Sequence, residues 1–129
     1  MFSYPYSYNV TIDTYDLGNG STAPCGYDTL GHELGHNMGL GHSLVQGSTG
    51  TVFDFGRGYG VHDQFTTVMA YPSSFGSASG VGLFSSPDLT CLDSFACGVD
   101  RNTSSGADAV YSINEIVPEI VQIHDENLS

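Results

Sequence analysis

The sequence has almost no positive charge. It contains no lysine and only two arginines, Arg57 and Arg101, against 14 aspartate and glutamate residues, so its formal net charge is −12. Binding to nucleic acid or to an anionic membrane needs a basic surface, and the composition therefore argues against both partners. The acidity is typical of solubility or salt adaptation, and it would mildly favour cationic substrates.

Long hydrophobic runs are also absent. No segment approaches the roughly 20 apolar residues that a membrane-spanning helix needs. The first ten residues, MFSYPYSYNV, have neither a basic region nor a leucine-rich core, so no secretion signal is visible. With 129 residues, of which 40% are hydrophobic and 12% aromatic, the chain is expected to form one globular domain over residues 1–129.

Cysteine is scarce, with three residues and no Cys-x-x-Cys spacing, so a zinc site built from cysteines is not expected. Cys91 and Cys97 are six residues apart around a short polar loop, and this pair is the candidate disulfide. Cys25 is left over, either as a free thiol or paired with a partner outside this chain.

Two segments are predicted to be helices. The first begins at an N-cap, Asp28 or Thr29, and runs to about Met38, where a glycine follows and ends it. The second extends over residues 107–124, because its apolar residues recur at helical spacing, and this stripe is interpreted as a face packed on the core. The stripe consists of Val110, Ile113, Val117, Ile120 and Val121. Pro118 lies inside the second pattern and should kink that helix or split it.

The other segments are interpreted as one strand and several connections. A strand is predicted around residues 7–13, which are rich in Tyr, Val, Ile and Thr. The connections are a turn-rich segment (16–26), an irregular excursion (43–66), a short apolar run ended by proline (66–72) and a flexible surface loop (73–82). The expected fold class is therefore α+β.

The segment HELGHNMGLGH, residues 32–42, has the spacing of a metal site. His32 and His36 are four residues apart, so on a helix they lie on one face and can bind the same ion. Glu33 is offset around the helix and can reach a water at the metal. Gly39 can adopt the left-handed conformation that ends the helix and turns the chain, which would bring His42 to the same ion.

Three neutral imidazoles with one open position are typical of a catalytic zinc site that holds a single Zn²⁺. Zinc would lower the pKa of water towards about 7, and Glu33 would take the proton as general base and later pass it to the leaving amine. The sequence therefore predicts a zinc endopeptidase. A zinc amidase or esterase with the same site is one alternative, and a non-catalytic zinc-binding fragment is the other. Loss of Glu33 would be typical of the latter, but Glu33 is present.

The extended motif resembles that of the metzincin metallopeptidases, and HELGHNMG with Asn37 looks most like the reprolysin branch. Bacterial reprolysin-like and peptidyl-Asp metallopeptidases are the most similar over the whole stretch. Metzincins also carry a Met-turn, and TVMAYP supplies one with Met69, 27 residues after His42. The resemblance implies that Met69 forms a hydrophobic floor under the histidines and is not a ligand. The alternative is a methionine that packs an ordinary core.

The resemblance also concerns Tyr71, two residues after the Met-turn methionine. Some metzincins place a tyrosine there as a fifth ligand or to stabilise the oxyanion, whereas reprolysins usually lack that role. Tyr71 is therefore a candidate for either role, with a structural place in the pocket wall as the alternative. The segment 71–75 would line the pocket for the residue after the scissile bond.

Two departures from the metzincin pattern are visible. Ser43 follows the third histidine, where adamalysins usually have aspartate, and only 31 residues precede His32. We therefore expect the C-terminal part of a catalytic domain that lacks its N-terminal strands, or else a minimal metzincin. A missing N-terminal subdomain or propeptide would then be a partner, beside a protein or peptide substrate. The resemblance and the cysteines imply an extracellular, secreted protein. His62 and His124 are interpreted as structural or surface residues.

Overall fold

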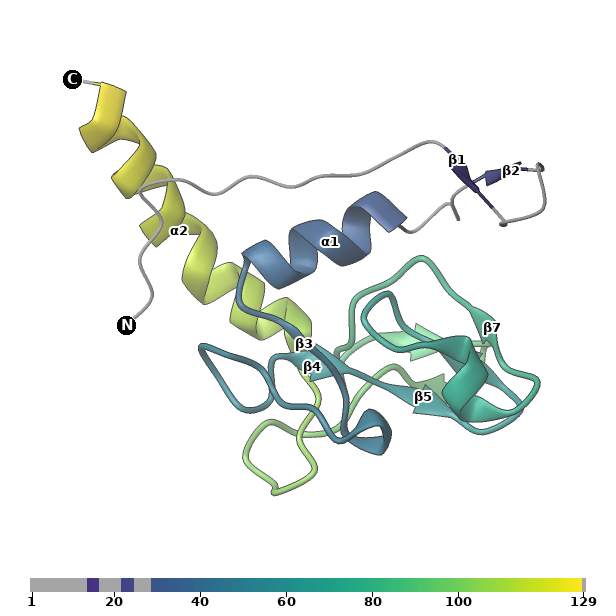
Figure 1. The fold of residues 1–129 in the computed structure, drawn as a ribbon. Coiled ribbons are helices and arrows are strands. Elements are labelled where there is room, and N and C mark those ends of the chain that lie inside the picture. Colours follow the sequence, from purple (N-terminus) through teal and green to yellow (C-terminus); the bar gives the residue numbers. More distant parts are fainter. Residues whose placement is uncertain (1–13, 17–21, 25–28, 129) are drawn as a thin grey trace.

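The computed structural model describes residues 14–16, 22–24 and 29–128 (Figure 1). These residues form two α-helices and several small sheets, so the predicted α+β class is confirmed. The strand predicted around residues 7–13 lies outside the described residues. Within them, helix α1 spans Thr29–Asn37 and helix α2 spans Ala109–Leu128. In Figure 1, the C-terminal half of α2 extends away from the region of strands β3 to β7.

Helix α1 ends as its sequence predicts. Gly39 has a φ of 83°, a left-handed conformation that a glycine adopts without a steric cost. The Gly39 N–H donates to the carbonyl of His36 at 3.0 Å, and the Leu40 N–H donates to that of Gly35 at 3.0 Å. These two bonds form a Schellman motif, which satisfies carbonyls at the helix end and reverses the chain. The turn leads directly into strand β3, which carries the third histidine.

The sheets are short and irregular. Strands β1 (Thr14–Asp16) and β2 (Thr22–Pro24) pair antiparallel, and β3 (Gly41–Ser43) pairs parallel with β4 (Arg57–Gly58). Strand β6 (Phe65–Thr66) lies between antiparallel β5 (Gly60–Val61) and parallel β7 (Ser79–Gly80). Strands β8 (Thr90–Cys91) and β9 (Phe95–Ala96) form a last antiparallel pair. Two 3₁₀ turns complete the set, η1 (Leu44–Gln46) and η2 (Pro72–Phe75).

Three sequence-based assignments need correction. The connection predicted over residues 16–26 contains strand β2, and the excursion over residues 43–66 contains η1 and strands β4 to β6. The loop over residues 73–82 contains strand β7 and most of η2. Strands of two or three residues show too little alternation to be recognised, because they are stabilised by partners far along the chain.

Two hydrophobic clusters hold these elements together. The first contains Leu40, which follows α1, together with Met69 of the Met-turn and Ala109 of α2. Ile113 of α2 packs against this cluster. It joins the exit of the first helix to the start of the second. The second cluster contains Phe65 of β6 and two cysteines described below. Met69 therefore packs in the first cluster, and the strand that precedes the Met-turn packs in the second.

Helix α2 begins with a cap and continues through its proline. The buried Asp108 accepts a hydrogen bond from the Tyr111 N–H at 3.2 Å, as an N-cap aspartate does. Pro118 lies inside one uninterrupted helix, so the predicted split does not occur. The buried face includes Ile116, whereas Val117 of the predicted apolar stripe is 38% exposed. None of the described helices is both long and apolar enough to cross a membrane.

Candidate active site

Three histidine side chains converge on one point. The Nε2 atom of His42 lies 3.2 Å from that of His32 and 3.1 Å from that of His36. The ligand atoms of all three lie within 4.8 Å of one another, as one metal ion requires. In a tetrahedral zinc site the nitrogens are about 3.3 Å apart, since each Zn–N bond is about 2.0–2.1 Å long. The geometry therefore fits a single ion held by three imidazoles.

The backbone sets the protonation of two of these rings. The Nδ1–H of His32 donates to the carbonyl of Val68 at 2.8 Å, and that of His36 donates to the carbonyl of Leu40 at 2.9 Å. Because a carbonyl can only accept, a neutral ring keeps its proton on Nδ1 and leaves the Nε2 lone pair free. Such outer hydrogen bonds typically orient histidine ligands. Both lone pairs therefore lie ready for a metal.

His42 comes from strand β3 and is held by its own backbone. Its N–H donates to Ser48 Oγ at 3.0 Å, which fixes the strand next to η1. Burial, helped by the positive charges that His36 and His32 would carry, lowers the pKa of His42 below 6.5. The shift favours the neutral imidazole, which is the form that binds metal.

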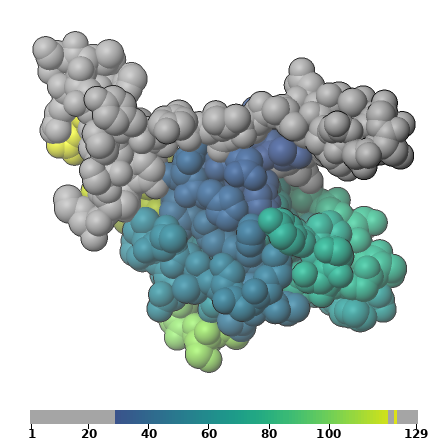
Figure 2. Space-filling view, in the orientation of Figure 1, coloured from purple at the N-terminus to yellow at the C-terminus, as the bar shows by residue number. Residues whose placement is uncertain are grey.

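Glu33 lies beside this cluster in a cavity wall. The cavity measures about 320 Å³ and is lined by His32, Glu33 and Tyr71, among others. Glu33 is half-buried, and its negative charge raises the pKa of His42, against the larger effect of burial. The carboxylate is thus near enough to the third histidine to interact with it. Figure 2 shows residues of α1 and the loop after it (blue) on this face, with the segment that follows the Met-turn (teal) beside them.

Met69 packs underneath helix α1. It is 1% exposed, and a Cβ atom added to Gly35 would overlap its sulfur. On the other side, a Cβ added to Gly58 of β4 would lie 2.6 Å from the Met69 carbonyl carbon. The two glycines therefore let a helix and a strand approach the Met-turn closely. This placement agrees with a floor under the histidines, a role that stays a prediction.

Tyr71 lies against the histidine cluster. Its ring centroid is 4.5 Å from that of His42 and 5.5 Å from that of His32, where the planes are nearly parallel. Its side chain is half exposed, so the ring forms part of the accessible wall. Its backbone N–H donates to Oε1 of Gln46 at 2.9 Å.

Gln46 is a residue that sequence reasoning missed. Its Oε1 also accepts from the Ser43 hydroxyl at 2.8 Å, so one amide joins the segment after the third histidine to the segment after the Met-turn. No sequence signal could have indicated this bridge, because its ends are 25 residues apart.

Two further histidines, His62 and His124, were predicted to be structural or surface residues. The side chain of His62 is exposed and lies 3.5 Å from Asp63, outside the histidine cluster. The side chain of His124 lies outside the described part.

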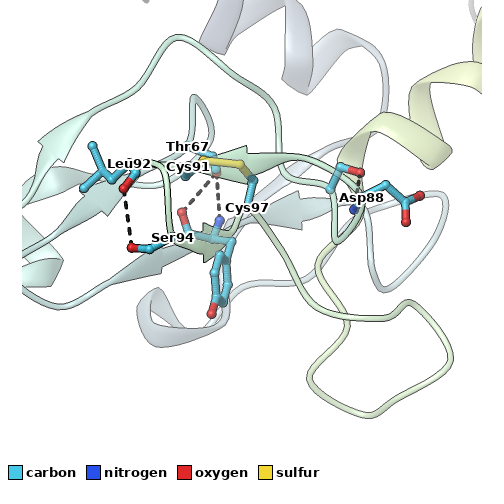
Figure 3. The surroundings of a disulfide bond; sticks show 8 residues. Thr67, Asp88, Cys91, Leu92, Ser94 and Cys97 are labelled. Carbon is cyan, nitrogen blue, oxygen red and sulfur yellow. Dashed lines mark hydrogen bonds between the residues drawn. A yellow bond between two sulfur atoms is a disulfide. The ribbon is translucent and has the colours of Figure 1, made fainter.

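The candidate disulfide is formed in the structure. Cys91 ends strand β8 and is bonded to Cys97, the residue after strand β9, with their Cα atoms 5.3 Å apart (Figure 3). Both cysteines are buried against Phe65, the residue before the end of β6. The bond therefore supports the strand that leads into the Met-turn. Cys25 lies outside the described residues.

Three histidines placed so that they could hold one metal ion are typical of mononuclear metalloenzymes, a class that includes metallopeptidases. The chain is 38% identical to the peptidyl-Asp metalloendopeptidase of Pseudomonas aeruginosa over an alignment of 109 positions that covers 74% of the chain. The chain spans 17% of the length of that relative. This similarity agrees with the predicted resemblance to bacterial peptidyl-Asp metallopeptidases. No family model matches the chain, and no solved structure matches it.

Proposed function

We propose that this chain carries the catalytic centre of a zinc endopeptidase, in which His32, His36 and His42 hold one Zn²⁺. The observation that supports it best is the convergence of the three Nε2 atoms at 3.1–3.2 Å around His42. Three imidazole ligands with an open fourth position are the donor set of catalytic zinc, and calcium or magnesium would need oxygen ligands instead. When bound, Zn²⁺ would supply a Lewis acid that acidifies water and polarises a carbonyl group.

The remaining chemistry belongs to residues of the chain. Glu33 is proposed to accept a proton from the attacking water and to deliver it to the leaving amine as the C–N bond breaks. Its place in the cavity wall beside His32 supports this role. Tyr71 is proposed to stabilise the negative charge that develops on the carbonyl oxygen, or to act as a fifth ligand. Its ring contacts with His32 and His42 support a position at the reacting group.

The substrate is proposed to be a protein or peptide. The relative from Pseudomonas aeruginosa is named as a peptidyl-Asp metalloendopeptidase, so its substrates include peptide bonds at aspartate. The disulfide between Cys91 and Cys97 supports an extracellular location, because such bonds persist in oxidising compartments.

Glu33→Gln tests the proposal. An amide cannot accept the proton from water, so the variant should keep its zinc and its fold while casein hydrolysis falls by about 10²- to 10⁴-fold. Glu115→Gln removes an exposed carboxylate of α2 and serves as the matched control, with hydrolysis like that of the parent. Equal activity of Glu33→Gln and the parent would place the base elsewhere.

The two alternative functions give different outcomes in the same experiment. A parent that cleaves esters or simple amides, but not casein, would indicate a zinc amidase or esterase. A parent that binds zinc and hydrolyses none of these substrates would indicate a non-catalytic zinc-binding fragment. Zinc content measured by elemental analysis after dialysis accompanies every assay, so loss of metal is distinguished from loss of the base.

A further inference from the structure

One side-chain oxygen connects the third histidine's segment to the pocket wall. Oε1 of Gln46 accepts a hydrogen bond from the Tyr71 N–H at 2.9 Å and another from the Ser43 hydroxyl at 2.8 Å. A backbone N–H can only donate, so the atom that faces it is the amide oxygen, whose two lone pairs match the two donors. Ser43 directly follows His42 and is 1% exposed. One acceptor therefore holds the segment after His42 and the backbone of Tyr71 together.

The turn that carries Gln46 is held at both of its ends. Gln46 is the last residue of η1, and the Ser43 N–H before the turn lies 3.5 Å from the same amide oxygen. After the turn, Gly47 has a φ of 77°, and its N–H donates to the Leu44 carbonyl at 2.9 Å. Short-range structure thus determines where the amide oxygen lies, and Tyr71 is its partner from 25 residues further along the chain.

The position of the Tyr71 ring depends on its backbone. The residue is 46% exposed, so packing encloses only part of the side chain. Its ring centroid lies 4.5 Å from that of His42 and 5.5 Å from that of His32. The next residue, Pro72, begins η2 and has a restricted φ. The proline limits the chain after Tyr71, and the hydrogen bond to Gln46 limits the peptide group before it, so together they direct the ring towards the histidines.

We propose that Gln46 is a positioning residue, whose amide oxygen holds the Tyr71 ring against His42 and His32. The inference rests on the proposed function, since Gln46 acts on the reacting group through Tyr71. The contacts close on themselves: the segment bound to one side of the oxygen carries His42, and the ring bound through the other side packs on His42. Loss of the oxygen should therefore displace the ring from the histidines.

Proton NMR of the metal-free full chain tests the position of the ring without turnover. An aromatic ring shifts the resonances of protons near its face, so the imidazole protons of His42 and His32 report where Tyr71 lies. Spectra are recorded at about pH 8, where histidine is neutral. Tyr71→Leu defines the spectrum without the ring. Gln46→Leu should move both histidine resonances most of the way to that spectrum, whereas Gln46→Glu keeps an acceptor oxygen and should leave them near those of the parent.

Gln64→Leu is the matched control, because Gln64 is exposed and precedes strand β6. Its spectrum should keep the His42 and His32 resonances of the parent. The exposed His62 lies outside the cluster and serves as the internal reference for the Gln46 variants. Unchanged resonances in Gln46→Leu, or an equal change in Gln64→Leu, would overturn the proposal. If circular dichroism shows that Gln46→Leu does not fold, Gln46→Asn replaces it, since it withdraws the oxygen by one methylene and should cause the same shifts.

Kinetics of the zinc-loaded chain separate positioning from a purely structural role. Displacing a group that stabilises developing charge lowers kcat, so Gln46→Leu should reduce kcat about ten-fold and change KM less than about two-fold. In a Tyr71→Phe background, which lacks the hydroxyl, Gln46→Leu should reduce kcat no further, because the amide acts through Tyr71. An equal loss of kcat in both backgrounds would overturn the proposal. A parent that hydrolyses nothing would contradict the proposed function, and the NMR spectra would still decide the role of Gln46.

Discussion

The contact between Gly35 and Met69 can be tested by a double-mutant cycle. Gly35→Ala would place a methyl group against the Met69 sulfur, with Leu40 Cδ1 only 3.3 Å away. Overpacking of this kind costs about 1–3 kcal/mol, while alanine in place of glycine stabilises a helix by about 1 kcal/mol. The single variant should therefore lose about 0–2 kcal/mol of unfolding free energy.

The partner variant, Met69→Ala, removes a side chain that is almost fully buried and should cost about 2–5 kcal/mol. In that background the new methyl group has room. Gly35→Ala should then stabilise the protein by about 1 kcal/mol through helix propensity alone. The sign of the Gly35→Ala effect therefore reverses, which corresponds to a coupling energy of about 1–3 kcal/mol.

The assay is urea unfolding followed by circular dichroism, because the chain contains no tryptophan to report by fluorescence. All four proteins are measured at one free zinc concentration, since bound metal adds to the apparent stability. Effects of Gly35→Ala that agree within about 0.5 kcal/mol in the two backgrounds would refute the contact between α1 and the Met-turn.

Three further predictions concern the surroundings of the site. Gln46→Leu should lower both stability and peptide hydrolysis, because it deletes the acceptor for the backbone after the Met-turn, whereas Gln46→Glu should retain both. Hydrogen bonds from the backbone and hydroxyl of Ser77 lower the pKa of Asp63 below 3.8. Its stabilising effect should be present above the ordinary pKa of 3.8 and be lost as pH falls through the lowered pKa, and in Asp63→Asn the melting temperature should fall less steeply over that pH range. Thiol titration of the oxidised protein should find one free thiol, and replacing Cys91 and Cys97 by serine should cost about 2 kcal/mol; a second or third free thiol would contradict the pairing.

The sequence was sufficient for the features encoded over short distances. The spacing of His32, His36 and His42 predicted their convergence, because a helix followed by a left-handed glycine has a fixed local geometry. The disulfide was likewise predicted from six residues of separation.

Features that depend on distant partners could not be predicted. Gly35 occupies a variable position of the histidine motif, and its packing on Met69 joins residues 34 positions apart. The role of Gln46 could not be predicted either, because the N–H group that donates to its Oε1 belongs to Tyr71, 25 residues along the chain. The prediction that Val117 packs on the core is wrong, since its side chain is exposed. A helical stripe alone does not determine which part of a wide apolar face is covered.

The central claim is that three histidines of this chain hold one zinc ion. An anomalous-diffraction crystal structure of the zinc-loaded protein tests it most directly. The account predicts one zinc peak, about 2.0–2.1 Å from the Nε2 atoms of His32, His36 and His42. A zinc ion bound elsewhere, or His42 more than about 8 Å from the other two imidazoles, would contradict the account, because that distance exceeds the span of any single zinc coordination sphere.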